Sequence, residues 1–202
     1  MGFSNILDNP FTSLAESFVK NVIMDKATPQ VGSILKVDLW GGAAAHTGVY
    51  IGNGEIVELY EDNGIGEIRI VKPNKFLHGE PDSLVRTGAY IYCACEDNVA
   101  LGAAEIAERA KNAIGEKHIY ELVGKNCHAF VSYCITGRTI SNKKISDKSL
   151  WTLMGVENSL EERFLLPVNG VTWRSAGKPK DFPTSQNSDN LVANFASSII
   201  PR

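Results

Sequence analysis

The sequence GKNCHAFVSYCITG occupies residues 124–137 and carries both a helix signal and a candidate reactive cysteine. Asn126 stands directly before Cys127, and the residues that follow have the apolar spacing of a helix. Because Asn is a strong N-cap residue, we predict a helix that starts at Asn126 and holds Cys127 in its first turn. The free amides and the positive end of the helix dipole stabilise a thiolate there, so they lower the pKa of the thiol. Such a thiol also needs a base that takes its proton.

The base is expected in a β-hairpin, HTGVYIGNGEIVELY, at residues 46–60. A three-residue loop at 52–54 gives the cleanest separation of apolar from polar side chains between the two faces. In this register one face carries Val49, Ile51, Val57 and Leu59. The other face carries His46 and Glu58 as diagonal neighbours, about 7–8 Å apart and within reach of each other's side chains. Gly48 is expected to leave open space beside the imidazole ring.

Cys127, His46 and Glu58 together fit the nucleophile, the base and the orienting group of thiol acyl transfer. The Glu58 carboxylate is expected to accept a hydrogen bond from one ring nitrogen of His46, so that the other nitrogen faces the sulfur. The first backbone amides of the cysteine helix are placed to bind the oxyanion. His128 is the competing base, but it adjoins the cysteine on the helix and points about 100° away from it.

Three further residues are expected at the site. Tyr50 and Tyr60 on the hairpin, together with Asn126, are predicted to line a substrate cleft. Each signal also has an ordinary structural interpretation, because a cysteine at a helix start is usually a small buried residue and a strand histidine beside a carboxylate is usually a surface pair. A non-catalytic binding domain that keeps the fold therefore stays open as an alternative.

The chain has 202 residues, of which 44% are hydrophobic, and a net charge of -3 at pH 7. This composition predicts a globular protein with one main core and argues against nucleic-acid binding, which usually needs a basic patch. We see neither an apolar run of about 18 residues nor a secretory signal pattern, so we expect a cytoplasmic protein. Peripheral contact with a membrane stays open, because residues 3–24 have a weak helical pattern with apolar residues on one face.

The remaining cysteines have structural explanations. Cys93 and Cys95 belong to an apolar strand pattern, and Cys134 lies two turns after Cys127 on the same stripe of the helix, so all three are expected in the core. The spacing of the four cysteines does not fit the repeated C-x2-C pattern of structural zinc sites. We therefore expect no metal and no cofactor.

The chain is expected to contain an N-terminal helical segment, a catalytic domain and a flexible C-terminal tail, at residues 1–30, 31–175 and 176–202. Within the domain, strands are predicted in addition to the hairpin at 31–39, 65–71 and 89–95. Helices are predicted at 98–114, 148–154 and 160–165. Loops are predicted at 41–45 and at 74–88, the second with a solvated His78.

The segments HTGVYIGNGEIVEL and NCHAFVSYCITG, in this order, resemble the lecithin retinol acyltransferase-like proteins, a circularly permuted branch of the NlpC-type, papain-like superfamily. The resemblance covers roughly residues 31–137. It implies an α+β fold in which an antiparallel sheet packs against a helix that bears the cysteine at its N-terminus, with His46 before Cys127 in the chain. Glu58 stands where the family often has a second His, and His128 stands where it usually has Glu.

The resemblance implies acyl-thioester chemistry, in which Cys127 attacks an ester or amide carbonyl and water or a second substrate then takes the acyl group. We expect the acyl donor to be a lipid ester or a similar small molecule. A peptidase or amidase that cleaves peptidoglycan or isopeptide bonds is the alternative enzyme, because the same segments also resemble the PPPDE-type isopeptidases. The identity of the acyl acceptor and the oligomeric state do not follow from the sequence.

Overall fold

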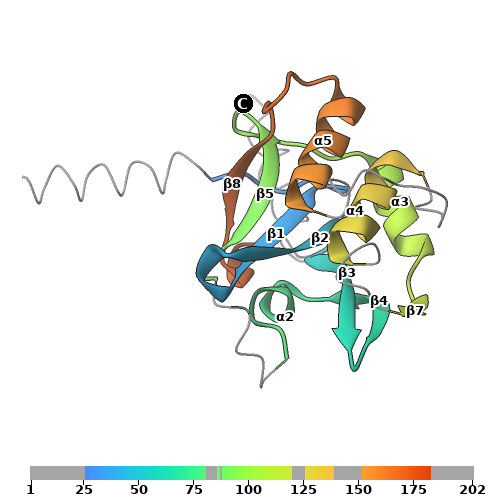
Figure 1. Cartoon of the computed structure of the whole chain (residues 1–202). Helices are drawn as coiled ribbons and strands as arrows, with labels where there is room; N and C mark the ends of the chain where they lie inside the picture. Colours follow the sequence, from blue (N-terminus) through green and yellow to red (C-terminus); the bar gives the residue numbers. More distant parts are fainter. Residues whose placement is uncertain (1–25, 81–85, 87, 120–125, 139–151, 183–202) are drawn as a thin grey trace, which may run out of the picture.

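The computed structural model of the chain describes residues 26–80, 86, 88–119, 126–138 and 152–182. These residues form one eight-stranded sheet with helices packed on its faces, which is an α+β architecture (Figure 1). The helix predicted at 3–24 and residues 183–202 of the predicted tail lie outside the described residues.

The strands follow the order β6-β5-β1-β2-β3-β4-β7, and β8 pairs with β5. Every pairing between the named strands is antiparallel, which agrees with the expected sheet. The strands are β1 (Ile34–Leu39), β2 (Ala44–Gly52), β3 (Glu55–Asp62), β4 (Ile65–Val71), β5 (Ile91–Glu96), β6 (Val99–Ala100), β7 (Lys117–Ile119) and β8 (Thr172–Gly177). The bounds of β4 are those predicted, whereas β1 and β5 each begin a few residues later than predicted.

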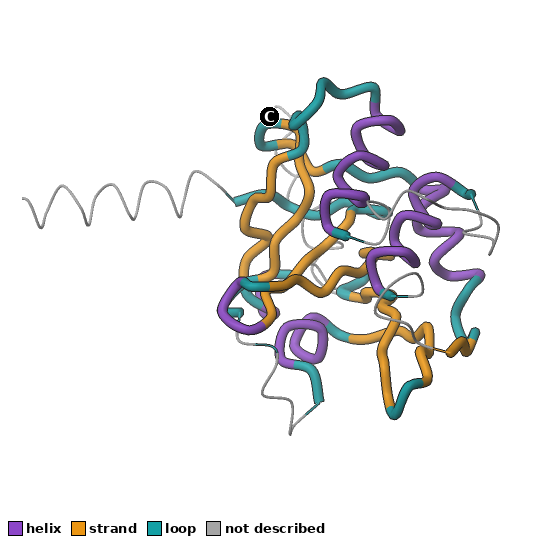
Figure 2. The backbone as a smooth tube through the Cα atoms, viewed as in Figure 1, coloured by secondary structure: helices purple, strands orange, loops and turns teal. Residues whose placement is uncertain are grey.

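The helices divide between the two faces of the sheet. They are α2 (Pro73–His78), α3 (Ala104–Asn112), α4 (Cys127–Thr136) and α5 (Leu153–Phe164), with short 3-10 turns at Trp40–Gly42 and Pro179–Asp181. Helices α3, α4 and α5 lie together, and their Ile106 and Val131 pack in one core cluster with Val49 of β2 (Figures 1 and 2). Helix α2 packs its Phe76 in a second cluster with Ile56 of β3. Among the helices of the described segments, none has the length and apolar character that crossing a membrane requires.

The β2–β3 hairpin has the predicted register in its body but a different turn. Gly48 pairs with Glu58, so each face of the hairpin carries the predicted side chains. The loop contains two residues rather than three, because Gly52 pairs with Glu55 after a bulge in β2. Residues 53 and 54 both have positive φ, 53° and 63°, which tight two-residue hairpin turns require. The bulge accommodates the extra residue, and the core pattern is therefore kept.

The helix predicted at 98–114 is shorter in the structure. Strand β6 occupies the start of this segment, and α3 begins only at Ala104. Residues 99 and 100 pair with β5 instead of entering the helix. The backbone also approaches closely just before α3, because a Cβ on Gly32 would lie 1.9 Å from the carbonyl oxygen of Ala103. This approach accompanies an extended conformation of Ala103, which is the N-cap residue of α3.

The loop predicted at 74–88 is wrong in its first part, which forms α2. This helix starts with Pro73 at its first position, a position that favours proline. It is stabilised by burial of Phe76 and Leu77 against the sheet. Six residues are too few to display a helical period in the sequence. His78 at the end of α2 is exposed, as predicted.

The tail predicted from residue 176 starts too early. Strand β8 continues to Gly177, and Phe182 is buried with its ring 5.9 Å from the ring of Tyr50. Polar residues surround these few apolar contacts in the sequence, so the composition of the segment hides them.

Two connections also differ from the prediction. One helix, α5, replaces the two short helices predicted near its position, and the part of the first that covers 148–151 lies outside the described residues. Thr152 caps α5, since its hydroxyl accepts a hydrogen bond from the Gly155 amide at 3.3 Å. In the loop predicted at 41–45, a 3-10 turn comes first and β2 already begins at Ala44.

Candidate active site

Helix α4 places Cys127 at its first position and is held at both ends. The Asn126 side chain accepts a hydrogen bond from the Ala129 amide at 3.0 Å, which is an N-cap interaction. At the other end Gly137 has a left-handed conformation. There Arg109 of α3 also donates to the carbonyl oxygen of Cys134 at 2.6 Å. The cysteine at the start of α4 is thus in a defined position, and only 6% of its surface is exposed.

Cys127 lies where strands β2 and β3 separate. Pairing between these strands ends at Gly48 and Glu58, whereas β2 continues along β1 and β3 continues along β4. Among the described pairings, residues 44–47 of β2 therefore have β1 as their neighbour but not β3. The start of α4 lies against this separation, because Nδ1 of His128 in its first turn is 3.1 Å from Thr47 Oγ1. The amide and the hydroxyl of Thr47 both act to lower the pKa of the Cys127 thiol.

His46 and Glu58 form the second part of the candidate site. His46 Nε2–H donates to Glu58 Oε2 at 2.8 Å, so the diagonal pair expected from the hairpin register is in direct contact. Both residues are buried, and Glu58 has no exposed surface. The bond sets the tautomer of the neutral ring and leaves Nδ1 as the nitrogen available to the sulfur.

His46 and Cys127 lie close enough together that each shifts the pKa of the other. Burial opposes the thiolate, but the charge of His46 and hydrogen bonds from His46 and Thr47 outweigh it, so the pKa of Cys127 is lowered. Burial and repulsion by Arg86 act to lower the pKa of His46. Attraction to the Cys127 thiolate and the hydrogen bond to Glu58 outweigh them, so the pKa of His46 is raised. Both shifts favour a thiolate–imidazolium ion pair near neutral pH.

Two arginines neutralise the Glu58 carboxylate. Arg69, opposite Glu58 on β4, donates to Oε1 from Nε at 3.1 Å and from Nη2 at 2.9 Å. Arg86 donates to Oε2 at 3.1 Å and to the carbonyl oxygen of Phe76 at 2.6 Å, which ties the carboxylate to α2. Burial acts to raise the pKa of Glu58, but the hydrogen bond and charge of His46, together with the arginines, lower it to about 2. The carboxylate is therefore an ionised acceptor for the imidazole at neutral pH.

The ring of Phe76 closes the space beside the imidazole. The centroids of the Phe76 and His46 rings are 5.4 Å apart. A Cβ on Gly48 would lie 2.9 Å from a ring carbon of Phe76 and 2.9 Å from the carbonyl oxygen of Val57. The expectation of open space at Gly48 is therefore wrong, since the absent side chain makes room for Phe76.

Replacing Gly48 with Ala is expected to destabilise the protein by about 1–3 kcal/mol, because the new methyl group overlaps the Phe76 ring and the Val57 backbone. Urea unfolding measures this change. Gly88→Ala is the matched control, since its Cβ would meet its nearest neighbour, the Asp38 amide, at an ordinary 3.4 Å. Equal urea midpoints for the two variants would contradict the close packing of Phe76.

The residues predicted to line a cleft lie in different surroundings. Tyr50 is four residues beyond His46 on β2, about 13 Å along the strand, and its hydroxyl accepts from the amide of Gly54 in the hairpin turn at 3.3 Å. Tyr60 packs under the guanidinium of Arg69, 3.6 Å from the ring centroid. Asn126 adjoins the cysteine. A role in substrate binding stays a prediction for all three.

His128 is directed towards Thr47. Its Nδ1 lies 3.1 Å from Thr47 Oγ1, and the residue is half-buried. Burial and then repulsion by His46 lower the pKa of His128 to about 4, so the ring is neutral at pH 7. His46 is thus the better placed of the two rings to act as the base for the cysteine.

The sequence did not indicate four residues that complete the site, namely Thr47, Arg69, Phe76 and Arg86. Arg69 faces Glu58 across the β3–β4 pair, and strand alternation offers a signal for it. Arg86 is 28 residues from Glu58 in the chain and comes, like Phe76, from a segment without a periodic pattern. No local signal identifies these last two residues.

The assembled side chains can perform acyl chemistry at one sulfur. The buried Cys127 thiol has the His46 ring as its candidate base. The ionised Glu58 carboxylate holds Nε2 of that ring and leaves Nδ1 for the thiol. The amide of Phe130 donates to the Asn126 carbonyl oxygen at 3.1 Å and that of Ala129 to the Asn126 side chain. The amides of Cys127 and His128 are then the candidates for binding an oxyanion. Within the described part of the chain, no three or more His, Cys, Asp or Glu side chains are grouped to hold a metal ion.

The comparison with known proteins gives one family. A family model with the description "Lecithin retinol acyltransferase" matches residues 27–140, which is more than half of the 202 residues. The matched segment contains His46, Glu58 and Cys127, and it begins before β1 and ends after α4. No curated protein sequence matches the chain.

Proposed function

The chain belongs to the lecithin retinol acyltransferase family, and on this basis we propose that it is a thiol acyl hydrolase or acyltransferase with Cys127 as the nucleophile. Membership of the family indicates acyltransferase or hydrolase activity in general. The observation that carries the finer proposal is the 2.8 Å bond between the His46 ring and the buried Glu58 carboxylate, in a pair in which His46 lowers the pKa of Cys127 and Cys127 raises the pKa of His46. The base precedes the nucleophile in the chain, which supports a circularly permuted papain-like fold of the NlpC type.

In the first half of the reaction, the Cys127 thiolate attacks the carbonyl carbon of the acyl donor, and negative charge moves to the carbonyl oxygen. The amides of Cys127 and His128 at the start of α4 bind this oxygen. The intermediate then collapses as the bond to the leaving group breaks. The leaving alkoxide takes a proton from Nδ1 of His46, and an acyl-Cys127 thioester remains.

In the second half, water or an acceptor alcohol gives its proton to Nδ1 of His46 and attacks the thioester carbonyl. The carbon–sulfur bond breaks, the acylated product leaves, and the Cys127 thiolate is restored beside a protonated ring. Glu58 keeps its charge throughout, because its pKa is about 2. It therefore stabilises the imidazolium in both halves of the reaction.

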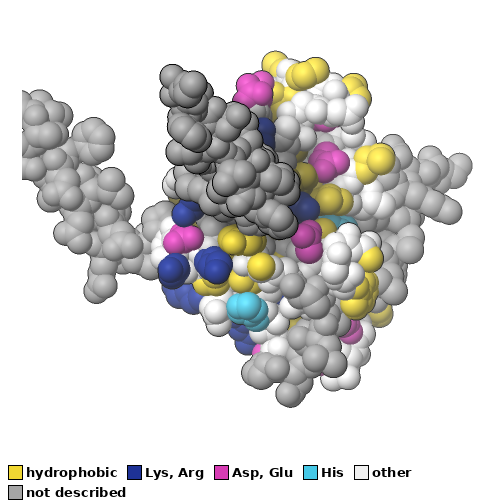
Figure 3. Space-filling view, turned by 90° about the vertical axis from the view of Figure 1, so that its left-hand side faces the viewer, with side chains coloured by type: hydrophobic (Ala, Val, Ile, Leu, Met, Phe, Trp, Pro, Cys, Tyr) yellow, Lys and Arg dark blue, Asp and Glu magenta, His cyan; other side chains and the backbone are white. Residues whose placement is uncertain are grey.

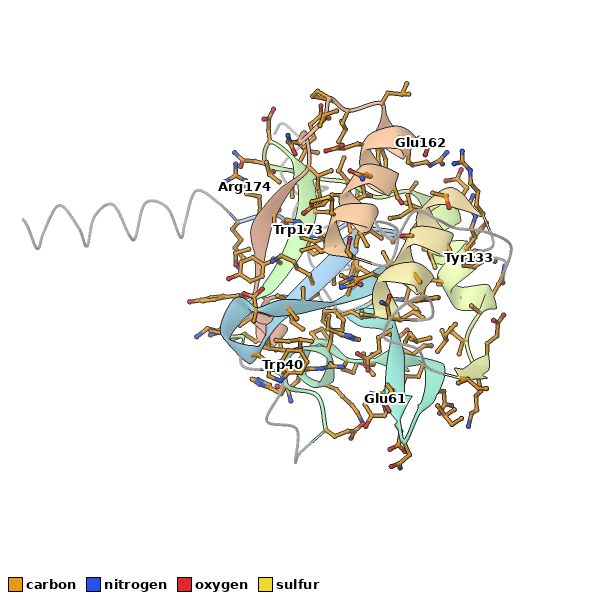
Figure 4. All side chains as sticks on the ribbon, in the orientation of Figure 1. Trp40, Glu61, Tyr133, Glu162, Trp173 and Arg174 are labelled. Atoms are coloured by element: carbon orange, nitrogen blue, oxygen red, sulfur yellow. The ribbon has the colours of Figure 1, made fainter. Side chains whose placement is uncertain are left out.

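We propose a lipid ester as the acyl donor, because the turn that leads into β2, the strand of His46, is exposed and apolar. Trp40, in the turn that joins β1 to β2, is 60% exposed (Figure 4). Trp40 comes three residues after Val37, and Val37 is the β1 residue that pairs with His46. Residues 39–45 carry no charged side chain. On the face seen in Figure 3, apolar side chains lie beside Lys and Arg side chains, a combination that suits acyl chains with polar head groups.

Intact-protein mass spectrometry tests the acyl-enzyme. The protein is incubated with a phosphatidylcholine, a fatty-acid ester of a small alcohol, a peptide amide and an isopeptide. An acyl group from the lipid ester is expected on Cys127 and is absent in Cys127→Ala. Cys134→Ala is the matched control on the same helix, since burial raises the pKa of Cys134 and keeps its thiol protonated.

The outcomes of this experiment separate the alternatives. An adduct with the peptide or isopeptide but none with the esters would replace the lipid substrate by an amide. Turnover of any of these substrates by Cys127→Ala at the wild-type rate would overturn the nucleophile. If no adduct forms, no substrate is turned over and Cys127 is unreactive, the protein is instead a non-catalytic binding domain.

A further inference from the structure

Thr47 and His128 form a second polar arrangement at the candidate nucleophile. Thr47 follows His46 on β2, so the two side chains leave the strand on opposite sides. Both nevertheless act to lower the pKa of the Cys127 thiol, which lies where β2 and β3 separate. Thr47 has no exposed surface, and its Oγ1 lies 3.1 Å from His128 Nδ1.

We infer that His128 and Thr47 form a chain of hydrogen-bond donors, from His128 Nδ1–H to Thr47 Oγ1–H to the Cys127 sulfur, which positions and stabilises the thiolate. This inference rests on the proposed function and adds two positioning residues to it. It differs from the role of His46, because His46 exchanges a proton with the sulfur whereas this chain only donates hydrogen bonds to it.

The direction of the chain follows from the inventory of protons. A threonine hydroxyl has one proton to donate and two lone pairs that accept. When its proton is directed to a thiolate, the bond to His128 must be one in which Oγ1 accepts, so Nδ1 of His128 carries the hydrogen. The pKa of His128, about 4, leaves a neutral ring with one N–H at pH 7. The thiolate therefore selects the Nδ1–H tautomer.

The backbone of Thr47 adds a further donor to the same sulfur. Its amide also acts to lower the pKa of the Cys127 thiol, and the end of the β2–β3 pairing at Gly48 leaves the β3 side of this strand to α4. Among the titratable groups of the described residues, His46 of β2 acts on the pKa of Cys127, and His128 adjoins Cys127 on α4. Glu58 and Arg86 act on the sulfur through the His46 ring.

Four variants of the full chain test the hydroxyl and the ring separately. Thr47→Val removes the hydroxyl at nearly constant shape, and Thr47→Ser keeps it. His128→Leu removes the ring donor, and His128→Asn, which has the same shape as Leu, keeps an N–H near the position of Nδ1. Each variant is treated with iodoacetamide from pH 5 to pH 10. The rate at Cys127 is followed by peptide mass spectrometry, and circular dichroism verifies the fold.

Thr47→Val is expected to slow alkylation at pH 7 by about 10-fold and His128→Leu by about 3-fold, because a hydrogen bond to a charged group is lost or weakened. The rates at high pH stay equal, since the thiolate is then fully formed in every variant. Thr47→Ser and His128→Asn remain within about 2-fold of the wild type. The double variant Thr47→Val, His128→Leu is no slower than Thr47→Val, because His128 acts only through the hydroxyl.

Three results would overturn the proposed chain of hydrogen bonds. These are a wild-type profile for Thr47→Val, a Thr47→Ser rate as low as that of Thr47→Val, and multiplied effects in the double variant. Failure of the proposed function gives a different result. In that case wild-type Cys127 reacts at pH 7 no faster than an unfolded thiol, whereas failure of this inference leaves a reactive wild-type cysteine.

Discussion

Replacing His46 with Ala will slow the alkylation of Cys127 at pH 7 by about 100-fold. It will slow acyl transfer by about 10³–10⁴-fold, because proton transfer is lost as well. Burial acts to raise the pKa of the Cys127 thiol, and the charge and hydrogen bond of His46 are the largest effects that oppose it. Without the ring the thiol becomes protonated at neutral pH. Iodoacetamide rates between pH 5 and pH 10 measure this change.

The pH profiles of the two proteins should differ in shape. In the wild type the pKa of Cys127 is lowered, so the thiolate persists below about pH 8.5, the pKa of a free cysteine. The alkylation rate therefore falls only when the pH approaches the lowered pKa of Cys127. In His46→Ala the rate rises with pH as for a buried thiol. His78→Ala is the matched control, because His78 is exposed at the end of α2. A wild-type profile for His46→Ala would show that the sulfur does not depend on the ring.

Replacing Glu58 with Gln is expected to destabilise the protein by about 3–5 kcal/mol, the usual cost of removing one partner from a buried ion pair. Glu58 has no exposed surface and accepts hydrogen bonds from His46, Arg69 and Arg86. The amide removes the carboxylate partner of Arg86 and leaves Arg69 with the partly exposed Glu80. Its neutral oxygen is also a weaker acceptor for the imidazolium, so acyl transfer should fall even under conditions where the variant is folded.

The stability difference should depend on pH with a definite sign. The pKa of Glu58 is lowered from 4.5 to about 2 in the folded protein. A carboxyl group with a lowered folded pKa contributes stability that is fully present above the unfolded value, near pH 4.5, and is lost as the pH falls towards 2. Urea unfolding of the wild type and Glu58→Gln at pH 7, 4 and 3 is therefore expected to show a shrinking difference between their midpoints.

Glu80 provides a matched control for this network. It also accepts a hydrogen bond from Arg69, at 2.9 Å, and it pairs with Lys75, but its side chain is 33% exposed. Water replaces the lost partner at such a position. Glu80→Gln is expected to leave the urea midpoint and the alkylation rate nearly unchanged. A loss equal to that of Glu58→Gln would indicate that the total charge of the cluster matters rather than the buried carboxylate.

Local patterns in the sequence indicated the candidate nucleophile and predicted its helix and the hairpin. Asn126 before Cys127 predicted the helix start, and the alternation of residues 46–60 predicted that His46 and Glu58 share a face. These features depend on neighbours a few residues apart, where capping and strand periodicity act directly. The turn residues and the short helix α2 were less predictable, since a bulge or six residues leave little periodic signal.

The tertiary structure alone decided what surrounds these residues. Arg86 reaches Glu58 over 28 positions of the chain, and His128 reaches Thr47 over 81. Only the folded sheet shows that β2 and β3 separate beside His46 and admit the start of α4. The physical reason is that such contacts depend on how whole elements pack, and packing is not encoded in the spacing of any one segment. The sequence therefore indicated the candidate nucleophile, base and carboxylate, and the fold determined the charges and hydrogen bonds that surround them.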